Sequence, residues 1–250
     1  MKQGSIRKAD RVSSDLLRQI VGGMVQPGDL LPKEDSLAET YGVNRSVVRE
    51  AVKLLEVHRL VRPIKRKGTI ALNPMGSMSP EVIHAMLSPR PGEIDVAVLK
   101  DVLEIRTHLD VEMSAMAADR RSEQDMENLD THFRNIEESR LDAQAYSDAL
   151  EAFTLSIAAA TGNRIYGMMV HWNHRVHAQL DDLMASVRQP SNAHLAGMKI
   201  LIELIRKQDS ESVRTVVRAF HGWATPRILT AAALRSGTAL EDINDLINAT

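Results

Sequence analysis

The chain has 250 residues, a formal net charge of −2 and no cysteine. This length suffices for one large or two modest domains with a real core, and the missing cysteine excludes disulfides, thiol chemistry and zinc sites built on cysteine. No stretch approaches the roughly 18 apolar residues that span a bilayer, and the N-terminus lacks the apolar segment of an export signal. We therefore expect a cytoplasmic protein with no membrane partner.

Charge is divided unevenly along the chain. Residues 1–73 contain fourteen Lys and Arg against eight Asp and Glu, whereas residues 74–250 contain seventeen against twenty-five. Such a division predicts that the first part meets a polyanion and that the second part does not.

The first elements read as a series of short helices. Apolar residues at helical spacing predict a helix over 11–24 and a second one over 34–41. Gly42 supplies the turn that follows, and Asn44 is a good N-cap for a third helix.

A hairpin and a linker are predicted next. Residues 62–72 read as two short strands around the basic tip Lys65-Arg66-Lys67-Gly68. Residues 73–80 are rich in Pro, Gly and Ser, the composition of a hinge. From about residue 96 the patterns are helical only, with breaks at 161–163, 188–192 and 225–226.

The third predicted helix divides into two faces. At 100° per residue its apolar face comprises Val48, Ala51, Val52 and Leu55, and its polar face comprises Arg45, Ser46, Arg49 and Lys53. Arginine can grip guanine bidentately or hold a phosphate, and a helix N-terminus adds affinity for phosphate. The alternative is a solvated charged face. The three helices, the basic hairpin and the positive charge together favour DNA binding.

Residues 12–72 resemble the winged helix–turn–helix of the GntR family of bacterial transcription regulators. The resemblance is carried by "PGDLLP", "GVNRSVVREA", "LV" and the closing "GT". It implies contacts of the third helix with DNA and a wing tip in the minor groove. We predict that the DNA-binding residues are Lys33, Arg45, Ser46, Arg49, Lys53, Arg66, Lys67 and Gly68. The chain departs from the family pattern at Asn44, where Ser is usual, at Asp35, where a DNA-contacting Arg is common, and at Arg66, which replaces a wing glycine.

The remainder resembles the FCD domain of the FadR branch of this family. Residues 101–121, Gly162-Asn163 and residues 205–221 carry the resemblance. It implies an antiparallel bundle of six or seven helices that encloses an effector pocket and is usually dimeric. The predicted fold is therefore mainly α: a winged helix–turn–helix with a small β-hairpin over 1–73, a linker over 74–95, and an all-α effector-binding and dimerisation domain over 96–250.

Arg106 is the first candidate effector ligand. It falls within the apolar stripe formed by Val102, Ile105, Leu109, Met113 and Met116. A guanidinium in such a place needs a partner. That partner is either internal (Glu104, Asp110 or an acidic residue of another helix) or the carboxylate of an effector.

The family resemblance also identifies four positions that hold a metal in many FCD domains. Here they are Leu150, Thr154, Met198 and Phe220. None is a strong ligand for a divalent ion, so we expect no metal cofactor and predict that these residues line an apolar part of the effector pocket. A shifted metal site using His194 or His221 is the alternative.

The segment "HWNHRVH" adds three histidines. Its helical wheel places His171 and Arg175 at the border of the pocket and turns His174 and His177 outward. We predict His171 and Arg175 as effector contacts and favour a solvated or dimer-contact face over a metal site for the rest.

These patterns predict a DNA-binding transcriptional regulator rather than an enzyme. We expect a repressor that binds a pseudo-palindromic operator of double-stranded DNA as a homodimer and responds to a small organic acid. The alternatives are a DNA-binding protein without an effector and a metal-dependent enzyme.

Overall fold

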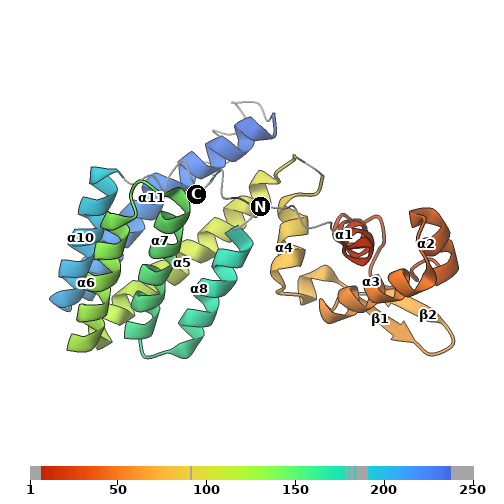
Figure 1. Cartoon of the computed structure of the whole chain (residues 1–250), viewed down its shortest axis with the longest axis horizontal. Coiled ribbons are helices and arrows are strands. Elements are labelled where there is room, and N and C mark those ends of the chain that lie inside the picture. The colour runs from red at the N-terminus through yellow and green to blue at the C-terminus, as the bar shows by residue number, and fades with distance from the viewer. Residues whose placement is uncertain (1–6, 91, 178–179, 181–182, 184–190, 238–250) are drawn as a thin grey trace. The chain divides into compact units, whose positions relative to one another are not determined.

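The computed structural model describes residues 7–90, 92–177, 180, 183 and 191–237. The chain forms two compact units, Met1–Asp95 and Val96–Thr250 (Figure 1). Over the described residues, no helix has the length and apolar character needed to cross a membrane.

Over its described residues, 7–90 and 92–95, the first unit contains four α-helices, a 3₁₀ turn and a two-stranded sheet. They are α1 (Lys8–Val21), α2 (Glu34–Tyr41), α3 (Arg45–Val57), β1 (Val61–Ile64), β2 (Gly68–Ala71), η1 (Pro74–Gly76) and α4 (Pro80–Leu87). This order is the helix–turn–helix with a hairpin wing that the sequence predicts. The first helix begins and ends three residues before the predicted 11–24, and Met24, which lies beyond its end, is exposed.

The helices of this unit share one apolar core. It includes Leu16 and Ile20 of α1, Leu37 of α2, and Val48 and Leu55 of α3. The apolar face predicted for α3 therefore packs inward, which turns its polar face toward solvent. Gly42 forms the turn between α2 and α3 with φ of 62°, a left-handed conformation that glycine adopts at little cost.

The wing is an antiparallel hairpin in which Val61 pairs with Ala71 and Ile64 with Gly68. Leu30 forms an isolated antiparallel bridge with Ile70, so the extended piece before α2 borders the hairpin. This contact fixes the base of the wing and leaves its tip exposed.

The segment predicted as a linker contains a helix. Ser79 caps α4 by accepting a hydrogen bond from the backbone of Val82, and Pro80 occupies the first helical position. Val82 and Ala85 are buried in the core of the first unit. The Pro, Gly and Ser residues that suggested a hinge thus serve as a 3₁₀ turn and a helix start, and the boundary between the units follows Asp95.

The second unit is helical throughout its described part. Its helices are α5 (Val96–Arg120), α6 (Glu123–Glu138), α7 (Ala143–Ala160), α8 (Arg164–His177), α10 (Asn192–Arg206) and α11 (Ser210–Arg235). The two long helices α5 and α11 pack along each other, and α7 packs against α5, α6 and α8 (Figure 1). Side-chain caps begin the helices α6, α7, α10 and α11, at Ser122, Asp142, Ser191 and Asp209.

One predicted break is wrong. Residues 225–226 were expected to end a helix, but α11 continues through Pro226 to Arg235. Proline costs a helix about 3 kcal/mol. Ala224, Ile228 and Leu229 are buried around it, and this packing offsets the local penalty.

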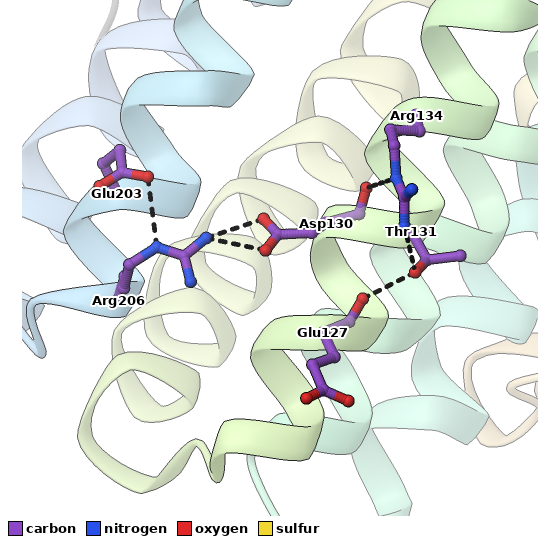
Figure 2. A network of polar contacts seen from close by, with 6 residues as sticks. All are labelled: Glu127, Asp130, Thr131, Arg134, Glu203 and Arg206. Atoms are coloured by element: carbon purple, nitrogen blue, oxygen red, sulfur yellow. Dashed lines mark hydrogen bonds and ion pairs between the residues drawn. The ribbon is translucent and has the colours of Figure 1, made fainter.

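A polar network ties α10 to α6 (Figure 2). One terminal nitrogen of Arg206 donates to both oxygens of Asp130, at 2.8 and 3.0 Å, and its Nε donates to Glu203 at 3.2 Å. On α6 itself, Arg134 donates to the hydroxyl of Thr131 at 3.1 Å. The hydrogen bond to Asp130 is the main cause that raises the pKa of Arg206 above its ordinary value.

Candidate functional site

The first candidate site is the basic surface of the winged unit. All eight residues predicted to bind DNA are exposed, and they come from the start of α2, the polar face of α3 and the wing tip. Lys33 precedes α2, Arg45, Ser46, Arg49 and Lys53 belong to α3, and Arg66, Lys67 and Gly68 form the tip with the first residue of β2.

Asn44 caps the third helix as predicted. Its side-chain oxygen accepts hydrogen bonds from the backbone of Val47 at 3.0 Å and from the hydroxyl of Ser46 at 2.8 Å. The cap fixes the first turn of α3, where Arg45 projects from an exposed helix N-terminus.

Both arginines of α3 carry a carboxylate partner. Asp35 contacts Nε of Arg45, and Glu34 accepts a hydrogen bond from Nε of Arg49 at 2.7 Å. The arginine side chains are nevertheless 66% and 63% exposed, which leaves them accessible to a large partner.

The wing tip has a strained backbone at Arg66. Its φ is 66°, and Gly68 follows with φ of 124°. A left-handed conformation costs a residue with a side chain roughly 1–2 kcal/mol. The position therefore favours glycine by conformation, although this chain has a cation there.

The second candidate site is a cavity of about 270 Å³ inside the second unit. Its wall comes from five helices, α5, α7, α8, α10 and α11. The polar residues of the wall are Arg106, Asp110, Ser114, Ser147, Glu151, Thr154, Asn173, His174, His194 and His221.

The four positions where the resemblance implies a metal all line this cavity. Leu150 and Thr154 come from α7, Met198 from α10 and Phe220 from α11. Their side chains offer no imidazole or carboxylate, so this set does not fit a divalent metal. The hydroxyl of Thr154 donates to the carbonyl of Leu150 at 3.0 Å. Across the part of the chain that the structure describes, no group of three His, Cys, Asp or Glu residues is arranged to hold a metal ion.

Arg106 lies in the cavity wall with an internal partner. Its Nε donates to Oδ2 of Asp110 at 3.4 Å, and Nε2 of His221 lies 3.1 Å from the same oxygen. Burial acts to raise the pKa of Asp110. The hydrogen bond with His221 and the charge of Arg106 outweigh this effect and hold that pKa below its ordinary value of 3.8. Asp110 is one of the internal partners that the sequence predicts for Arg106.

The residues around Arg106 differ from the predicted stripe. Met113 is buried and lines the cavity, but Ile105 is 57% exposed. The buried face of α5 includes Leu99, Leu103 and Val111 instead. Arg106 therefore lies at the edge of the buried face rather than within it.

The prediction for α8 is wrong about which histidine lines the cavity. His174 belongs to the wall, whereas His171 and Arg175 are exposed and lie outside it. Nδ1 of His171 and Nε2 of His174 each lie 3.3 Å from a different oxygen of Glu151. The side chain of His177 lies outside the described residues.

The helical wheel of α8 failed because two of its large apolar residues do not pack inward. Ile165 and Met168 are 57% and 65% exposed. Because the helical wheel assumes that large apolar residues face the core, these two residues shift the predicted core-facing side of α8 away from the observed one.

Two polar groups of the wall are not predicted from the sequence, the amide of Asn173 and the hydroxyl of Ser147, and His194 was named only as an alternative metal ligand. The amide oxygen of Asn173 is buried and has no hydrogen-bond partner among the described residues. His194 lies with Nδ1 3.1 Å from the hydroxyl of Tyr146. Its ring stacks on Phe220, with centroids 5.6 Å apart and planes 10° apart. Ser147 adds a hydroxyl.

Two protein-family models match the chain. The model of bacterial regulatory proteins of the gntR family matches residues 8–70, and the FCD domain model matches residues 101–221. One match lies within each of the two units described above.

Curated proteins of similar sequence are transcriptional regulators. An uncharacterized HTH-type transcriptional regulator of Mycobacterium tuberculosis is 24% identical over 94% of this chain and 92% of its own length. The HTH-type transcriptional regulator LutR of Bacillus subtilis is 26% identical over 90% and 95%. The galactonate operon transcriptional repressor of Escherichia coli is 24% identical over 58% and 63%.

A solved structure supports the fold. Lar, which controls the expression of the Listeria monocytogenes agr system, superposes with a TM-score of 0.59 at 18% identity. The match covers 92% of this chain and 99% of Lar.

Proposed function

The chain belongs to the gntR family of bacterial regulatory proteins and carries an FCD domain, and on this premise we propose that it is a repressor whose operator affinity falls when a small organic acid enters the cavity of the second unit. It is a DNA-binding transcriptional regulator by family. The acid, the sign of control and the contacting residues belong to the proposal.

DNA contacts are assigned to α3 and the wing. The exposed arginines of the capped helix support this role, because bidentate donors at the N-terminal end of a recognition helix reach base edges. Lys53 and the cations of the wing tip add salt-dependent contacts with phosphate. We propose that a homodimer presents two such units to a pseudo-palindromic operator, since protein two-fold symmetry and operator symmetry correspond.

The cavity is the main observation that supports the binding of an effector. At about 270 Å³ it lies just below the range for small-molecule sites, roughly 300–1,000 Å³. It therefore suits a small metabolite better than a long-chain ligand. A DNA-binding protein without an effector is not expected to keep such a space between five helices.

Arg106 is the proposed anchor for the carboxylate of the effector. Its hydrogen bond to Asp110 uses Nε, and the four remaining N–H donors sit on the terminal nitrogens, whose fork matches a carboxylate. The internal pair thus orients the guanidinium while it leaves the fork to the ligand.

The rest of the wall suggests what else the acid carries. The buried amide oxygen of Asn173 and the hydroxyls of Ser147 and Thr154 would hydrogen-bond polar substituents, and Met198 and Phe220 would cover an apolar portion. The name of the E. coli relative refers to galactonate, a sugar acid, and hydroxylated acids are accordingly the first candidates.

A thermal-shift screen against small carboxylic and hydroxycarboxylic acids tests the anchor. We expect at least one acid to raise the melting temperature of the wild type and to leave that of Arg106→Ala unchanged. Arg214→Ala is the matched control, because Arg214 pairs with Glu112 and Glu211 in the same bundle but outside the cavity. The control Arg214→Ala should show the same rise in melting temperature as the wild type. If Arg106→Ala shows that rise too, or if no acid raises the melting temperature of the wild type, the role of Arg106 is wrong.

The sign of control is tested with the acid that the screen identifies. In an electrophoretic mobility-shift assay on duplexes selected by the wild-type protein, the acid should weaken the complex. Stronger binding in its presence would reverse the assignment as a repressor.

A further inference from the structure

Two acidic residues of α2 face the two arginines that are expected to read DNA. Glu34 and Asp35 are neighbours in the first turn of α2, and Arg45 and Arg49 lie one turn apart on α3. Asp35 contacts Arg45, and Glu34 lies 2.7 Å from Arg49. The two ion pairs are therefore in register along the helix, and each joins a different turn of α3 to α2.

These pairs contribute little to the stability of the fold. The side chains of Asp35 and Glu34 are 59% and 43% exposed, and the arginines are more exposed still. Exposed ion pairs of this kind stabilise a fold only slightly, because solvent screens the charges and holding both side chains in one geometry costs entropy. Carboxylates are favoured at the start of α2 by the helix dipole, but the dipole does not account for the register with the arginines.

The same carboxylates carry a cost for DNA affinity. In a helix–turn–helix, the helix that precedes the recognition helix crosses the phosphate backbone. Two negative charges at the start of α2 oppose the phosphates and also offset the charge of both arginines. Their presence is therefore expected to lower the affinity for DNA of any sequence.

The atoms that form the ion pairs indicate a benefit that offsets this loss of DNA affinity, namely the orientation of both arginines. Each carboxylate engages Nε of its arginine, and the two terminal nitrogens retain four N–H donors. Bidentate recognition of guanine needs two such donors held toward O6 and N7. A guanidinium bonded through Nε has lost much of its rotational freedom before it meets the base, so less entropy is lost on binding.

We propose that Glu34 and Asp35 are positioning and specificity-determining residues of DNA recognition. They hold Arg49 and Arg45 for bidentate contact with guanine and reduce their attraction to phosphate. The chain gives up general affinity for DNA and gains discrimination between sequences. The inference rests on the proposed role of α3 as the recognition helix.

Selection from a random pool of duplex DNA tests the proposal on the full chain. The wild type and the variants Asp35→Ala, Glu34→Ala, Arg45→Ala, Arg49→Ala and Glu39→Ala each select duplexes that are then sequenced. Glu39 is the matched control, because it is an exposed carboxylate of the same helix and has no ion pair within the described residues. Thermal melting of each variant verifies folding.

We expect the wild type to select guanine at a position whose preference is lost in Arg45→Ala. Asp35→Ala should weaken the preference at that same position, and Glu34→Ala at the position read by Arg49. Glu39→Ala should select the wild-type motif. By fluorescence anisotropy, Asp35→Ala should bind a shuffled duplex more tightly than the wild type does. Its preference for the selected duplex over the shuffled one should fall about fivefold or more, since one bidentate contact discriminates by about 1–3 kcal/mol.

The outcomes distinguish a wrong assignment of α3 as the recognition helix from a wrong assignment of Glu34 and Asp35 as positioning residues. If Arg45→Ala selects the wild-type motif, the role of α3 in base recognition is wrong. If Arg45→Ala loses the guanine but Asp35→Ala and Glu34→Ala keep it, only the positioning role fails. An equal rise in affinity for all sequences in Asp35→Ala and Glu39→Ala would likewise reduce the carboxylates to a general electrostatic effect and overturn the proposal.

Discussion

Asp110 of α5 and His221 of α11 meet across the two long helices of the bundle, with Oδ2 of the carboxylate 3.1 Å from Nε2 of the imidazole. The same carboxylate oxygen accepts a hydrogen bond from Arg106. One acidic group thus joins two helices and orients the guanidinium proposed as the effector anchor.

Asp110→Asn is expected to destabilise the second unit in a pH-dependent way. The pKa of Asp110 is lower in the folded state than its ordinary value of 3.8. Its ionised form therefore stabilises the fold fully above that value, and the contribution is lost as the pH falls through the folded pKa. We expect a deficit of about 1–3 kcal/mol at neutral pH.

Chemical denaturation of the wild type and Asp110→Asn at about pH 7 and about pH 3 measures this difference. The gap in unfolding free energy should narrow at the lower pH. Asp148→Asn, at an exposed carboxylate of α7 that accepts a hydrogen bond from Gln144, should show no such change. A gap of the same size at both pH values would contradict the account.

Metal removal is expected to leave the protein unaffected. Leu150, Thr154, Met198 and Phe220 supply no strong ligand, and His194 and His221 are engaged by Tyr146 and Asp110. Dialysis against EDTA should not change the melting temperature, and elemental analysis should find no stoichiometric zinc or nickel. Bound metal that is lost in His194→Ala or His221→Ala would instead establish the shifted site.

Apolar packing is expected to outweigh the polar network of α6 and α10. Leu129 is fully buried, and Leu129→Ala should cost about 2–5 kcal/mol. Asp130 follows Leu129 on α6, and Arg206→Met removes its ion pair with Arg206. Because the arginine side chain is 38% exposed, we expect this variant to lose at most about 1 kcal/mol of unfolding free energy. Urea unfolding of both variants gives the comparison, and an equal or larger loss for Arg206→Met would contradict it.

Local chemistry made the helix–turn–helix and the wing of the first unit predictable from the sequence, whereas α4 lies in the segment predicted as a linker. The cap at Asn44, the turn at Gly42 and the apolar spacing of α3 are encoded within a few residues of where they act. The four positions that the family resemblance associates with a metal are a different case, because their prediction rests on that resemblance and not on local chemistry; all four line the cavity.

Features that depend on tertiary contacts were not predictable. The helix α11 continues through Pro226 because helix residues on either side of it are buried in the core. His174 rather than His171 lines the cavity because α8 exposes apolar side chains. The pairs of Asp35 with Arg45 and of Asp110 with His221 join different helices, and no spacing along one helix could reveal them. Asp110 alone was foreseen, as a neighbour one turn from Arg106.

Tyr41 is expected to ionise only in strong alkali. Its hydroxyl donates to Asp15 at 2.6 Å and accepts from Gln19 at 3.2 Å, which links α2 to α1. Burial and the nearby carboxylate raise the pKa of Tyr41 from 10.0 to about 12. The stability gained from the protonated phenol is present below pH 10 and is lost as the pH rises through about 12.

Ultraviolet difference titration of the wild type against Tyr41→Phe isolates this phenol from the other two tyrosines. The difference should appear near pH 12, and the variant should be less stable by about 0.5–1.5 kcal/mol at neutral pH. A difference that titrates near pH 10 would show that the hydroxyl does not hold its bond to Asp15 in solution.

Arg66 combines an unfavourable conformation with a charge at the wing tip, and the two properties can be separated. Arg66→Gly should relieve the left-handed strain and raise the stability of the first unit by up to about 1 kcal/mol. It should also lower DNA affinity, and the salt dependence of binding should fall by about one phosphate contact. Arg66→Lys keeps both the charge and the strain, so its salt dependence should match that of the wild type.

Thermal melting and anisotropy titrations at several salt concentrations measure the two effects on the same preparations. A stable Arg66→Gly variant with unchanged salt dependence would place the wing tip away from the phosphates. A variant that loses stability would mean that contacts of the arginine side chain outweigh the cost of its backbone conformation. Only the combination of higher stability and weaker, less salt-dependent binding fits a strained residue retained for its charge.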